Sequence, residues 1–322
     1  MIRDQSMIPA LVLTAGLGTR LQPLSFVRAK GALPIGSEPL ARRILRWLGN
    51  AGVRDAVLNL HHLPHTLTGA IGDGSDIGMR IRYSWEVPVL GSAGGPRRAL
   101  PLLDGAGEER PFLIVNGDTL TNVDIMSLVA AHRKSGAMVT MAVLPNVDPQ
   151  KYGGVTADGQ GRLTGFVPRG TSQGSFHFIG VQVVDPRAFA SVSTSIPSEV
   201  RQLYTSLAAQ DPEGIRLFRT EAEFMDIGTP ADYLNTALAI AEREHLPLAG
   251  ARSRIHVSAR VERSVLWDDV AVEEGAMLKE CVVADGVVVP ADTSWHGVTL
   301  RVPTRELAAG ERVIQGLAVC SL

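Results

Sequence analysis

The sequence predicts an α/β fold built on one large sheet, followed by a shorter β-rich domain. Two observations support this prediction. Up to about residue 118, apolar runs of strand length alternate with helical stretches, which is typical of βαβ units. After residue 245, the chain changes to short β-branched steps separated by turn-forming Asp and Gly. With 322 residues, 45% of them hydrophobic, the chain can bury the cores of a large and a small domain.

The first half supplies the alternating elements in order. Strands are expected at 10–14, 55–60, 79–84 and 111–116, and helices at 39–52 and 65–72. In such units the strands are parallel, and ligands bind beyond their carboxyl ends. The stretches AGLGTR (15–20) and NGDT (116–119) each directly follow a strand. Both are therefore expected at the ligand-binding edge of the sheet.

From Met138 the order changes to several consecutive strands. The expected strands lie at 138–144, 152–158, 162–167, 176–184, 214–219 and 222–228, with helices at 198–209 and 230–244. This arrangement predicts an insertion into the fold, followed by a return to the same sheet.

The region after His245 shows a short repeat. Ile255, Val261 and Trp267 lie six residues apart, and the same spacing recurs in a shifted phase at Val270, Ala276, Val282 and Val288. A six-residue period predicts a few rungs of parallel β-helix, in which each rung buries its apolar residues against the next. The broken phase leaves an irregular antiparallel hairpin cap as the alternative. Residues 291–322 receive no assignment.

The composition excludes several classes of partner. A formal net charge of -2, without a long Lys/Arg block, argues against binding to nucleic acid or to an anionic membrane surface. No apolar stretch approaches the roughly 18 to 20 residues that span a bilayer. Cys281 and Cys320 have no metal-binding spacing, which fits a reducing compartment. A cytoplasmic protein with a small ligand is expected.

The Gly-rich turn of LVLTAGLGTRL (11–21) suggests phosphate binding. A dinucleotide fingerprint needs a third glycine where Leu21 stands, and the Gly-Lys-Ser/Thr of a Walker loop never occurs. Gly16 and Gly18 still allow backbone N–H groups to approach an anion, and Arg20 adds a forked, permanently charged donor. Lys30 supplies a second cation ten residues later, and two cations suit a polyphosphate. The alternative for each cation is a surface salt bridge.

These residues resemble a known family, the sugar-1-phosphate nucleotidyltransferases. LTAGLGTRLQPLS…AKGALPI (13–35) matches nearly every position of its opening signature, except that Ala29 and Gly31 replace two prolines. The resemblance continues, in the family's order, through LGSAGG (90–95), VNGDTL (115–120), KYGG (151–154) and FMDIGTPADYL (224–234). It implies a Rossmann-like mixed-sheet nucleotidyltransferase domain at 1–247, followed by a short left-handed β-helix-like domain at 248–322.

The reaction implied by the resemblance needs cations and a metal. A sugar 1-phosphate oxygen attacks the α-phosphorus of a nucleoside triphosphate, and pyrophosphate leaves. Arg20 is expected to bind the departing end of the triphosphate, and Lys30 to bridge the α-phosphate and the incoming phosphate. Asp118 and Asp226 follow strands, and their hard oxygens are expected to bind Mg²⁺, with Asp118 counted among the catalytic residues. The alternative is that one of them is an N-cap or turn carboxylate.

The resemblance also implies two binding sites. The residues expected at the nucleotide are Leu13, Ala15, Gly16, Gly18, Thr19, Glu86, Gly91 and Ser92, and those at the sugar are Asn116, Gly117, Tyr152, Gly153 and Arg169. LGSAGG has a plain helix-entry turn as its alternative. In GFVPRG, Pro168 and Arg169 stand where many relatives have Glu-Lys, so Arg169 is expected to replace the lysine and the sugar stays open. The histidines at 61, 62 and 65 are assigned no chemistry.

The substrate is ranked from one stretch. SWEVPVLGSAGG (84–95) resembles the mannose-1-phosphate guanylyltransferase branch, which predicts GTP and mannose 1-phosphate as substrates, with Glu86 accepting hydrogen bonds from guanine N1 and N2. Uridylyl or thymidylyl transfer to another sugar 1-phosphate stays open. So does an inactive regulatory subunit, although Arg20, Lys30, Asp118 and Asp226 are all present. Acyl transfer on the β-helix is a further alternative, with His256 taken as the only histidine of its rungs. A homo-oligomer is possible because exposed rungs can pack across subunits.

Overall fold

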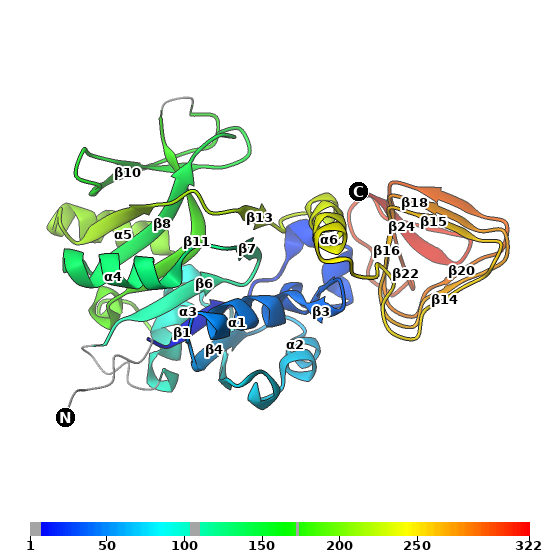
Figure 1. The fold of residues 1–322 in the computed structure, drawn as a ribbon, viewed down its shortest axis with the longest axis horizontal. Coiled ribbons are helices and arrows are strands. Elements are labelled where there is room, and N and C mark those ends of the chain that lie inside the picture. Colours follow the sequence, from blue (N-terminus) through cyan, green and yellow to red (C-terminus); the bar gives the residue numbers. More distant parts are fainter. Residues whose placement is uncertain (1–7, 104–109, 172–173) are drawn as a thin grey trace. The chain divides into compact units, whose positions relative to one another are not determined.

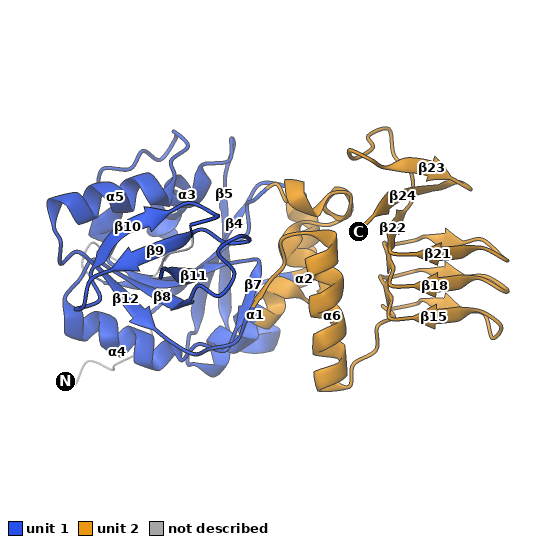
Figure 2. Cartoon of the chain, turned by 90° about the horizontal axis from the view of Figure 1, so that it is seen from above, with its two compact units in different colours: residues 1–16, 44–62, 71–224 blue, residues 17–43, 63–70, 225–322 orange. Residues whose placement is uncertain are grey.

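The computed structural model describes residues 8–103, 110–171 and 174–322. The chain divides into two compact units, coloured in Figure 2. Unit 1 is drawn from residues 1–16, 44–62 and 71–224, and unit 2 from residues 17–43, 63–70 and 225–322. Unit 2 therefore combines the turn-rich segment that carries Arg20 and Lys30 with the C-terminal part of the chain.

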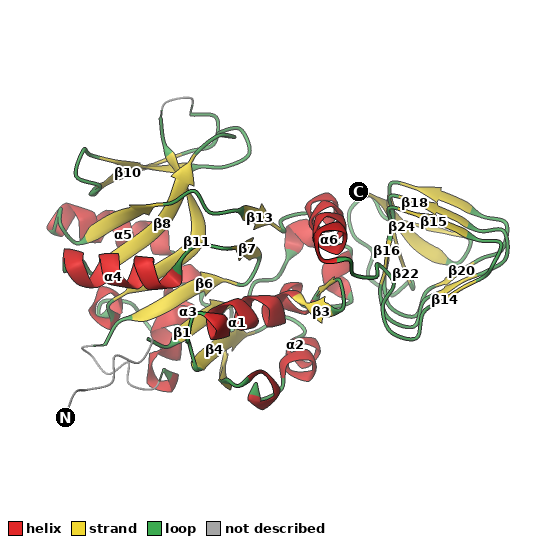
Figure 3. Ribbon diagram, viewed as in Figure 1, coloured by secondary structure: helices red, strands yellow, loops and turns green. Residues whose placement is uncertain are grey.

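Unit 1 is built on a mixed sheet that has nine strands among the described residues (Figures 1 and 3). Its main path runs β10 (Leu163–Val167), β9 (Gly154–Ala157), β11 (Phe176–Val184), β6 (Phe112–Asn116), β1 (Ala10–Leu13), β4 (Asp55–Leu60) and β5 (Arg80–Trp85). The other two strands are β8 (Val139–Pro145), which pairs with β11, and β12 (Ile215–Arg219), which pairs with β8.

The strands after Met138 do not form a separate insertion, because β8 to β12 all belong to the same sheet as β1, β4, β5 and β6. β1, β4, β5 and β6 pair in parallel, as expected for βαβ units. β11 runs antiparallel to β6, β8 and β9. β12 then joins the same sheet parallel to β8. The mixed sheet expected from the sequence is therefore present, and each expected strand lies within a few residues of its predicted place.

Helices cover both faces of this sheet (Figure 2). They are α3 (Gly91–Ala99), α4 (Ile125–Ser135) and α5 (Val200–Gln210). Ile114 and Met141 belong to the core that contains Tyr204 of α5. Thr140, the neighbour of Met141, instead contacts His132 of α4, so alternate residues of β8 serve opposite faces. Two further elements, β7 (Thr119–Thr121) and β13 (Phe224–Asp226), are short.

The segment at the start of unit 2 contains little regular structure. It consists of 3-10 turns at Thr19–Leu21, Leu24–Phe26 and Lys30–Ala32, followed by the hairpin of β2 (Pro34–Ile35) and β3 (Glu38–Pro39). The helices that follow in the chain are α1 (Leu40–Asn50), most of which belongs to unit 1, and α2 (Pro64–Ile71) and α6 (Pro230–Glu244), which belong almost entirely to unit 2. Thr229 is the N-cap of α6, and its hydroxyl accepts a hydrogen bond from the Asp232 N–H at 3.1 Å.

A parallel β-helix follows α6, so the hairpin alternative is wrong for residues 254–301. Its three faces are β14 (Arg254–Ile255), β17 (Ala271–Val272) and β20 (Val288–Val289); β15 (Arg260–Glu262), β18 (Met277–Lys279) and β21 (Ser294–His296); and β16 (Val265–Leu266), β19 (Val282–Val283) and β22 (Val298–Arg301). Figure 2 shows β15, β18 and β21 stacked in layers. An antiparallel pair, β23 (Arg312–Ile314) and β24 (Leu317–Ser321), extends the third face.

The register explains why the six-residue pattern breaks. Arg254 pairs with Ala271 and Ala271 with Val288, so each coil advances by 17 residues instead of 18. One face of each coil is therefore a residue shorter than a strict hexapeptide repeat requires. Val288, predicted to be buried, is 52% exposed, whereas its neighbour Val289 is fully buried. The rungs also continue past 291, so His256 is not their only histidine, because His296 lies on β21.

Candidate functional site

The loop after β1 is held by one buried side chain. The Thr14 and Ala15 N–H groups both donate to Asn59 Oδ1, at 2.6 and 3.2 Å, and the Thr14 hydroxyl donates to the Asn59 carbonyl. Asn59 stands on the neighbouring strand β4, so strand pairing brings it to the loop. Gly16 follows, and a methyl group built on it would meet no atom within 4 Å. The backbone of the loop is thus fixed by its hydrogen bonds to Asn59, while space remains open beside Gly16.

Glu86 completes this arrangement, which we call the Asn59–Glu86 network. Its carboxylate is fully buried, and its two oxygens accept hydrogen bonds from Asn59 Nδ2 at 2.7 Å and from the Leu90 N–H at 2.8 Å. A methyl group on Gly95 would lie 2.5 Å from Glu86 Oε1, so this position needs glycine. Sequence reasoning missed Asn59, which a polar residue inside an otherwise apolar strand could have revealed.

The stretch LGSAGG begins helix α3. Gly91 has a φ of +75°, and a methyl group on it would lie 2.7 Å from the Ser198 carbonyl oxygen. The Ser92 hydroxyl donates to Glu199 Oε2 at 2.6 Å and accepts from the Val200 N–H at 2.9 Å. The helix-entry turn is therefore present, and its small residues allow close packing against 198–200. Nucleotide binding by Gly91 and Ser92 stays a prediction.

The end of β6 presents Asn116, Gly117 and Asp118 in sequence. The Gly117 N–H donates to the Leu13 carbonyl, and a methyl group on Gly117 would lie 2.5 Å from that oxygen. Asn116 packs against Gly180 of β11, and a methyl group built on Gly180 would lie 2.8 Å from the Cβ of Asn116. The close approach of these backbones fixes Asn116, and Asp118 lies just beyond the strand's carboxyl end, as predicted.

Tyr152 lies in an aromatic group that the sequence did not reveal. Its ring centroid is 4.2 Å from that of His177 and 5.8 Å from that of Phe224. Burial lowers the pKa of His177, which favours the neutral ring. A methyl group on Gly153 would lie 3.1 Å from the Val167 carbonyl oxygen. The structure brings Tyr152 and Gly153 into one strand-end region, whereas Arg169 is exposed on the loop after β10.

The cations expected at the phosphates lie in unit 2. Gly18 has a φ of +63°, and its carbonyl accepts hydrogen bonds from the Leu21 N–H and the Ser25 hydroxyl, both at 2.9 Å. This turn buries Leu21 and leaves Thr19 and Arg20 exposed. Lys30 begins a later 3-10 turn and is half-buried.

Three charged side chains gather around Gly228. A methyl group built on this buried glycine would lie 3.1 Å from Arg20 Nη1, 3.1 Å from Asp226 Oδ2 and 3.2 Å from Asp232 Oδ2. Arg20 and Asp226 were expected at the site, whereas Asp232 was missed. Asp226 itself is not the N-cap of α6, because Thr229 has that role. The arrangement can hold a guanidinium and two hard carboxylates close together.

The predicted residues thus fall into two groups. Unit 1 contains Leu13, Ala15, Gly16, Glu86, Gly91, Ser92, Asn116, Gly117, Asp118, Tyr152, Gly153 and Arg169, and unit 2 contains Gly18, Thr19, Arg20, Lys30 and Asp226. Over residues 8–103, 110–171 and 174–322, no three His, Cys, Asp or Glu side chains form a metal-binding group. Within the same ranges, no helix is both long and apolar enough to cross a membrane.

Comparison with known proteins identifies the family. The profile described as Nucleotidyl transferase matches residues 9–243. The chain belongs to the nucleotidyl transferase family. A second profile, described as GlmU-like C-terminal hexapeptide, matches residues 246–299, which form the β-helix of this member of the family.

Individual relatives of this nucleotidyl transferase are distant. A probable mannose-1-phosphate guanylyltransferase of Oryza sativa subsp. japonica is 27% identical over 314 residues, covering 91% of this chain and 82% of that protein. A UTP–glucose-1-phosphate uridylyltransferase of Synechocystis sp. is 24% identical, covering 82% of this chain and 72% of that protein. The crystal structure of HddC from Yersinia pseudotuberculosis aligns with a TM-score of 0.61 and 20% identity, over 72% of this chain and 98% of that one.

Proposed function

We propose that the chain transfers a nucleoside monophosphate to a sugar 1-phosphate with release of pyrophosphate, using GTP and mannose 1-phosphate or a related manno-configured sugar. The observation that carries the proposal is the convergence of Arg20, Asp226 and Asp232 on Gly228. Nucleotidyl transfer needs charge of both signs at one place, to bind phosphate and to hold a metal. Family membership and the named activities of the relatives support the reaction class.

Arg20 and Lys30 bind phosphate in this proposal. The guanidinium of Arg20 offers a planar fork that matches two phosphate oxygens. We assign it to the departing end of the triphosphate. Lys30, half-buried, is assigned to the α-phosphate and the incoming phosphate, where a compact charge lowers the repulsion between two anions.

Asp118 and Asp226 are proposed to hold Mg²⁺. Each is a hard oxygen donor, which fits a Mg²⁺ ion that keeps waters and substrate oxygens as its other ligands. Asp118 follows the tight turn after β6, and Asp226 ends β13, so neither carboxylate is buried in a core. When bound, the metal would neutralise phosphate charge.

The nucleotide is proposed to lie on the loop of residues 13–19, with Gly91 and Ser92 at the nucleoside. GTP is favoured by the guanylyltransferase relative, and the HddC structure has also been determined with GMP-PN. Glu86 is fully buried and already accepts two hydrogen bonds. A direct contact of Glu86 with guanine therefore requires the base to reach a covered carboxylate, and it stays a prediction.

The sugar is proposed to lie near Asn116, Gly117, Tyr152 and Gly153, with Arg169 as a phosphate donor. To these we add His177 and Phe224, because their rings contact Tyr152, His177 tilted at 39° and Phe224 edge-on, and aromatic rings suit the face of a pyranose. We further propose residues 1–247 as the catalytic domain and 248–322 as the β-helix domain. The uridylyltransferase relative keeps UTP as a second candidate.

The test is a matrix of ATP, CTP, GTP, UTP and dTTP against a panel of sugar 1-phosphates, scored by pyrophosphate release. GTP with a manno-configured sugar phosphate should give the highest kcat/KM. If UTP or dTTP exceeds GTP by more than about tenfold with every sugar, the guanylyl assignment is wrong. If no pair releases pyrophosphate above the level of an Asp118→Ala preparation made in parallel, the transferase proposal itself fails.

A further inference from the structure

The segment that carries Arg20 and Lys30 needs support from outside itself. The regular structure of residues 18–32 consists of short 3-10 turns, whose hydrogen bonds link neighbours three or four residues apart. Such turns have poor hydrogen-bond geometry and little stability of their own. Two side chains of this segment, Phe26 and Arg28, reach residues of the C-terminal part of unit 2 instead.

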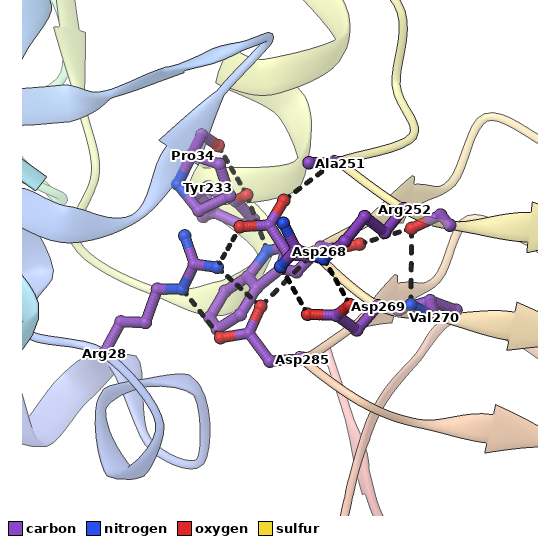
Figure 4. A network of polar contacts seen from close by, with 11 residues as sticks. Arg28, Pro34, Tyr233, Ala251, Arg252, Asp268, Asp269, Val270 and Asp285 are labelled. Carbon is purple, nitrogen blue, oxygen red and sulfur yellow. Dashed lines mark hydrogen bonds and ion pairs between the residues drawn. The ribbon is translucent and has the colours of Figure 1, made fainter.

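Arg28 forms the first of these links (Figure 4). Its Nε and Nη2 donate to the two oxygens of Asp285, at 2.7 and 2.6 Å, and Nη2 also donates to Asp268 at 2.7 Å. Its guanidinium carbon lies 5.4 Å from the centre of the Trp267 ring. A forked pair combined with an aromatic face defines both the position and the plane of the guanidinium. We call Arg28 with Trp267, Asp268 and Asp285 the Arg28 clamp.

Asp268 and Asp285 occupy equivalent places on successive coils of the β-helix, 17 residues apart. Asp285 Oδ1 accepts from the Asp268 N–H, and Asp268 Oδ1 accepts from the Ala251 N–H. Stacking two carboxylates in this way brings like charges together, which is unfavourable without a cation between them. Burial disfavours the charged form of Arg28, yet its hydrogen bonds to Asp285 and Asp268 outweigh this effect and raise its pKa. The β-helix thus presents a site that Arg28 neutralises.

The clamp is connected to a buried hydrogen-bond chain. Trp267 is fully buried, and its Nε1–H donates to the Tyr233 hydroxyl at 2.9 Å. That hydroxyl donates in turn to the Pro34 carbonyl at 2.6 Å. Tyr233 lies on α6 and Pro34 on β2, directly after the segment of residues 18–32. The chain is therefore attached to the Trp267–Asp268 turn of the β-helix within the segment, through Arg28, and just after it, through Pro34 and Tyr233.

Phe26 provides a link to the last strands. The guanidinium carbon of Arg301 lies 5.1 Å from the centre of the Phe26 ring. Arg301 is 1% exposed and forms a bidentate pair with Glu311, at 2.8 and 2.7 Å. This buried pair holds residues 301–311, which lie within the stretch 291–322 that has no sequence-based assignment.

We propose that Arg28 is a positioning residue for nucleotidyl transfer, through which the β-helix holds residues 18–32 so that Arg20 and Lys30 keep their places. The inference rests on the proposed function, and it makes the β-helix part of the phosphate-binding apparatus. Arg28 acts through its neighbours, because two of its three nitrogens already donate to carboxylates and its face lies against Trp267. Asp268 and Asp285 then serve the reaction although they contact no substrate.

The variants that test this are Arg28→Ala, Arg28→Lys and the pair Asp268→Asn with Asp285→Asn. Arg28→Ala should lower kcat about ten- to a hundredfold, the effect of a small misplacement of charged groups, with a smaller change in KM. Arg28→Lys should recover part of the loss, since it keeps the charge without the fork. The matched control is Arg252→Ala, which removes the exposed bidentate pair with Asp269 on the same coils. It should change kcat by less than about twofold.

Hydrogen exchange supplies a readout that does not depend on activity. Amides in residues 18–32 should exchange about tenfold faster or more in Arg28→Ala and in the double Asn variant, but not in Arg252→Ala. Unchanged exchange overturns the proposal, even if no substrate is ever found. Loss of activity in Arg28→Ala alone, with the double Asn variant fully active, also overturns it and makes Arg28 a substrate contact. If Arg28→Ala fails to fold, Asp285→Asn alone is measured in the same two assays.

Discussion

The loop of residues 14–16 and the segment of residues 18–32 are neighbours in sequence, but they are held by opposite means. In unit 1 the Asn59–Glu86 network uses a neutral amide and a fully buried carboxylate to fix the Thr14 and Ala15 N–H groups. In unit 2 the Arg28 clamp uses ion pairs, whose side chains are 18% exposed for Arg28, 35% for Asp268 and 30% for Asp285.

The two kinds of support differ in whether they mainly stabilise the fold or mainly orient a side chain. Removing a partner from a buried network leaves an unsatisfied polar group, which costs about 1–3 kcal/mol. Partly exposed ion pairs contribute about 1 kcal/mol or less, but a bidentate fork still restricts orientation. The loop of unit 1 is therefore fixed by the same interactions that stabilise the fold. The segment of unit 2 can be loosened while the fold persists.

Each unit contains one carboxylate that is proposed to bind metal. Removing either carboxylate should have the largest effect on turnover. Asp118→Ala in unit 1 and Asp226→Ala in unit 2 should each lower turnover at least about a thousandfold, because the metal contributes several kcal/mol of charge stabilisation. Pyrophosphate release and circular dichroism would show an inactive but folded protein. Asp269→Asn, which changes an exposed carboxylate outside both regions, is the control. Full activity of the parent protein in excess EDTA would contradict the metal assignment.

The second prediction compares backbone donors with the single guanidinium. Residues 14–18 offer N–H groups, whereas Arg20 offers a fork, so Arg20→Lys keeps the charge and loses the bidentate geometry. Turnover should fall by about one to three orders of magnitude, the range for a preorganised donor. Steady-state kinetics with varied nucleoside triphosphate would measure it. An unchanged rate would contradict the phosphate-binding role of Arg20 and favour the alternative, a surface salt bridge.

The third prediction tests whether low pH destabilises unit 1 by protonating a buried histidine. His132 is buried beside Thr140, and burial lowers its pKa to about 4. Below pH 6.5 the unfolded chain binds a proton that folded His132 rejects, so the free energy of unfolding should fall by up to about 3 kcal/mol between pH 6.5 and 4.

Urea unfolding at several pH values would measure this slope. His132→Gln should flatten it, because glutamine does not titrate, whereas the exposed His256→Gln should leave it unchanged. An equal slope in His132→Gln and the parent protein would show that other groups cause the acid sensitivity.

The fourth prediction concerns the crowding around Gly228. Gly228→Ala places a methyl group 3.1 Å from Arg20 Nη1 and from Asp226 Oδ2, so at least one of these side chains must shift. We expect kcat/KM to fall about tenfold with little change in stability. Gly69→Ala, where a methyl group would meet nothing within 4 Å, is the matched control. Equal activity of both variants would mean that Arg20 can move without consequence.

The smallest effect should come from salt. Raising NaCl from about 0.05 to 0.5 M screens partly exposed charges, so exchange of the amides in residues 18–32 should rise by no more than about threefold. The Thr14 and Ala15 amides, bonded to buried Asn59, should not change. Equal salt sensitivity in both regions would remove the distinction between the network and the clamp.

The sequence by itself determined the elements and the chemistry at strand ends. Apolar runs of strand length and helical stretches are local patterns, so the strands and helices could be predicted with their order. The signature residues Arg20, Lys30, Asp118 and Asp226 could be predicted because their types and spacing are local as well. Glu86 was also singled out, but the hydrogen bonds that occupy its oxygens were not foreseen.

Only the tertiary structure decided how these residues are held. Asn59 lies 45 residues from Thr14 in the chain, and Asp285 lies 257 residues from Arg28, so no local pattern links them. The β-helix register shows the same limit, because the 17-residue coil follows from hydrogen bonding between successive coils, and a count of six along the chain misplaced Val288. Residues 301–311 have no repeat to read, and their structure depends on the buried pair of Arg301 with Glu311. Long-range pairing of polar groups is selected by burial and geometry, which a single sequence does not display.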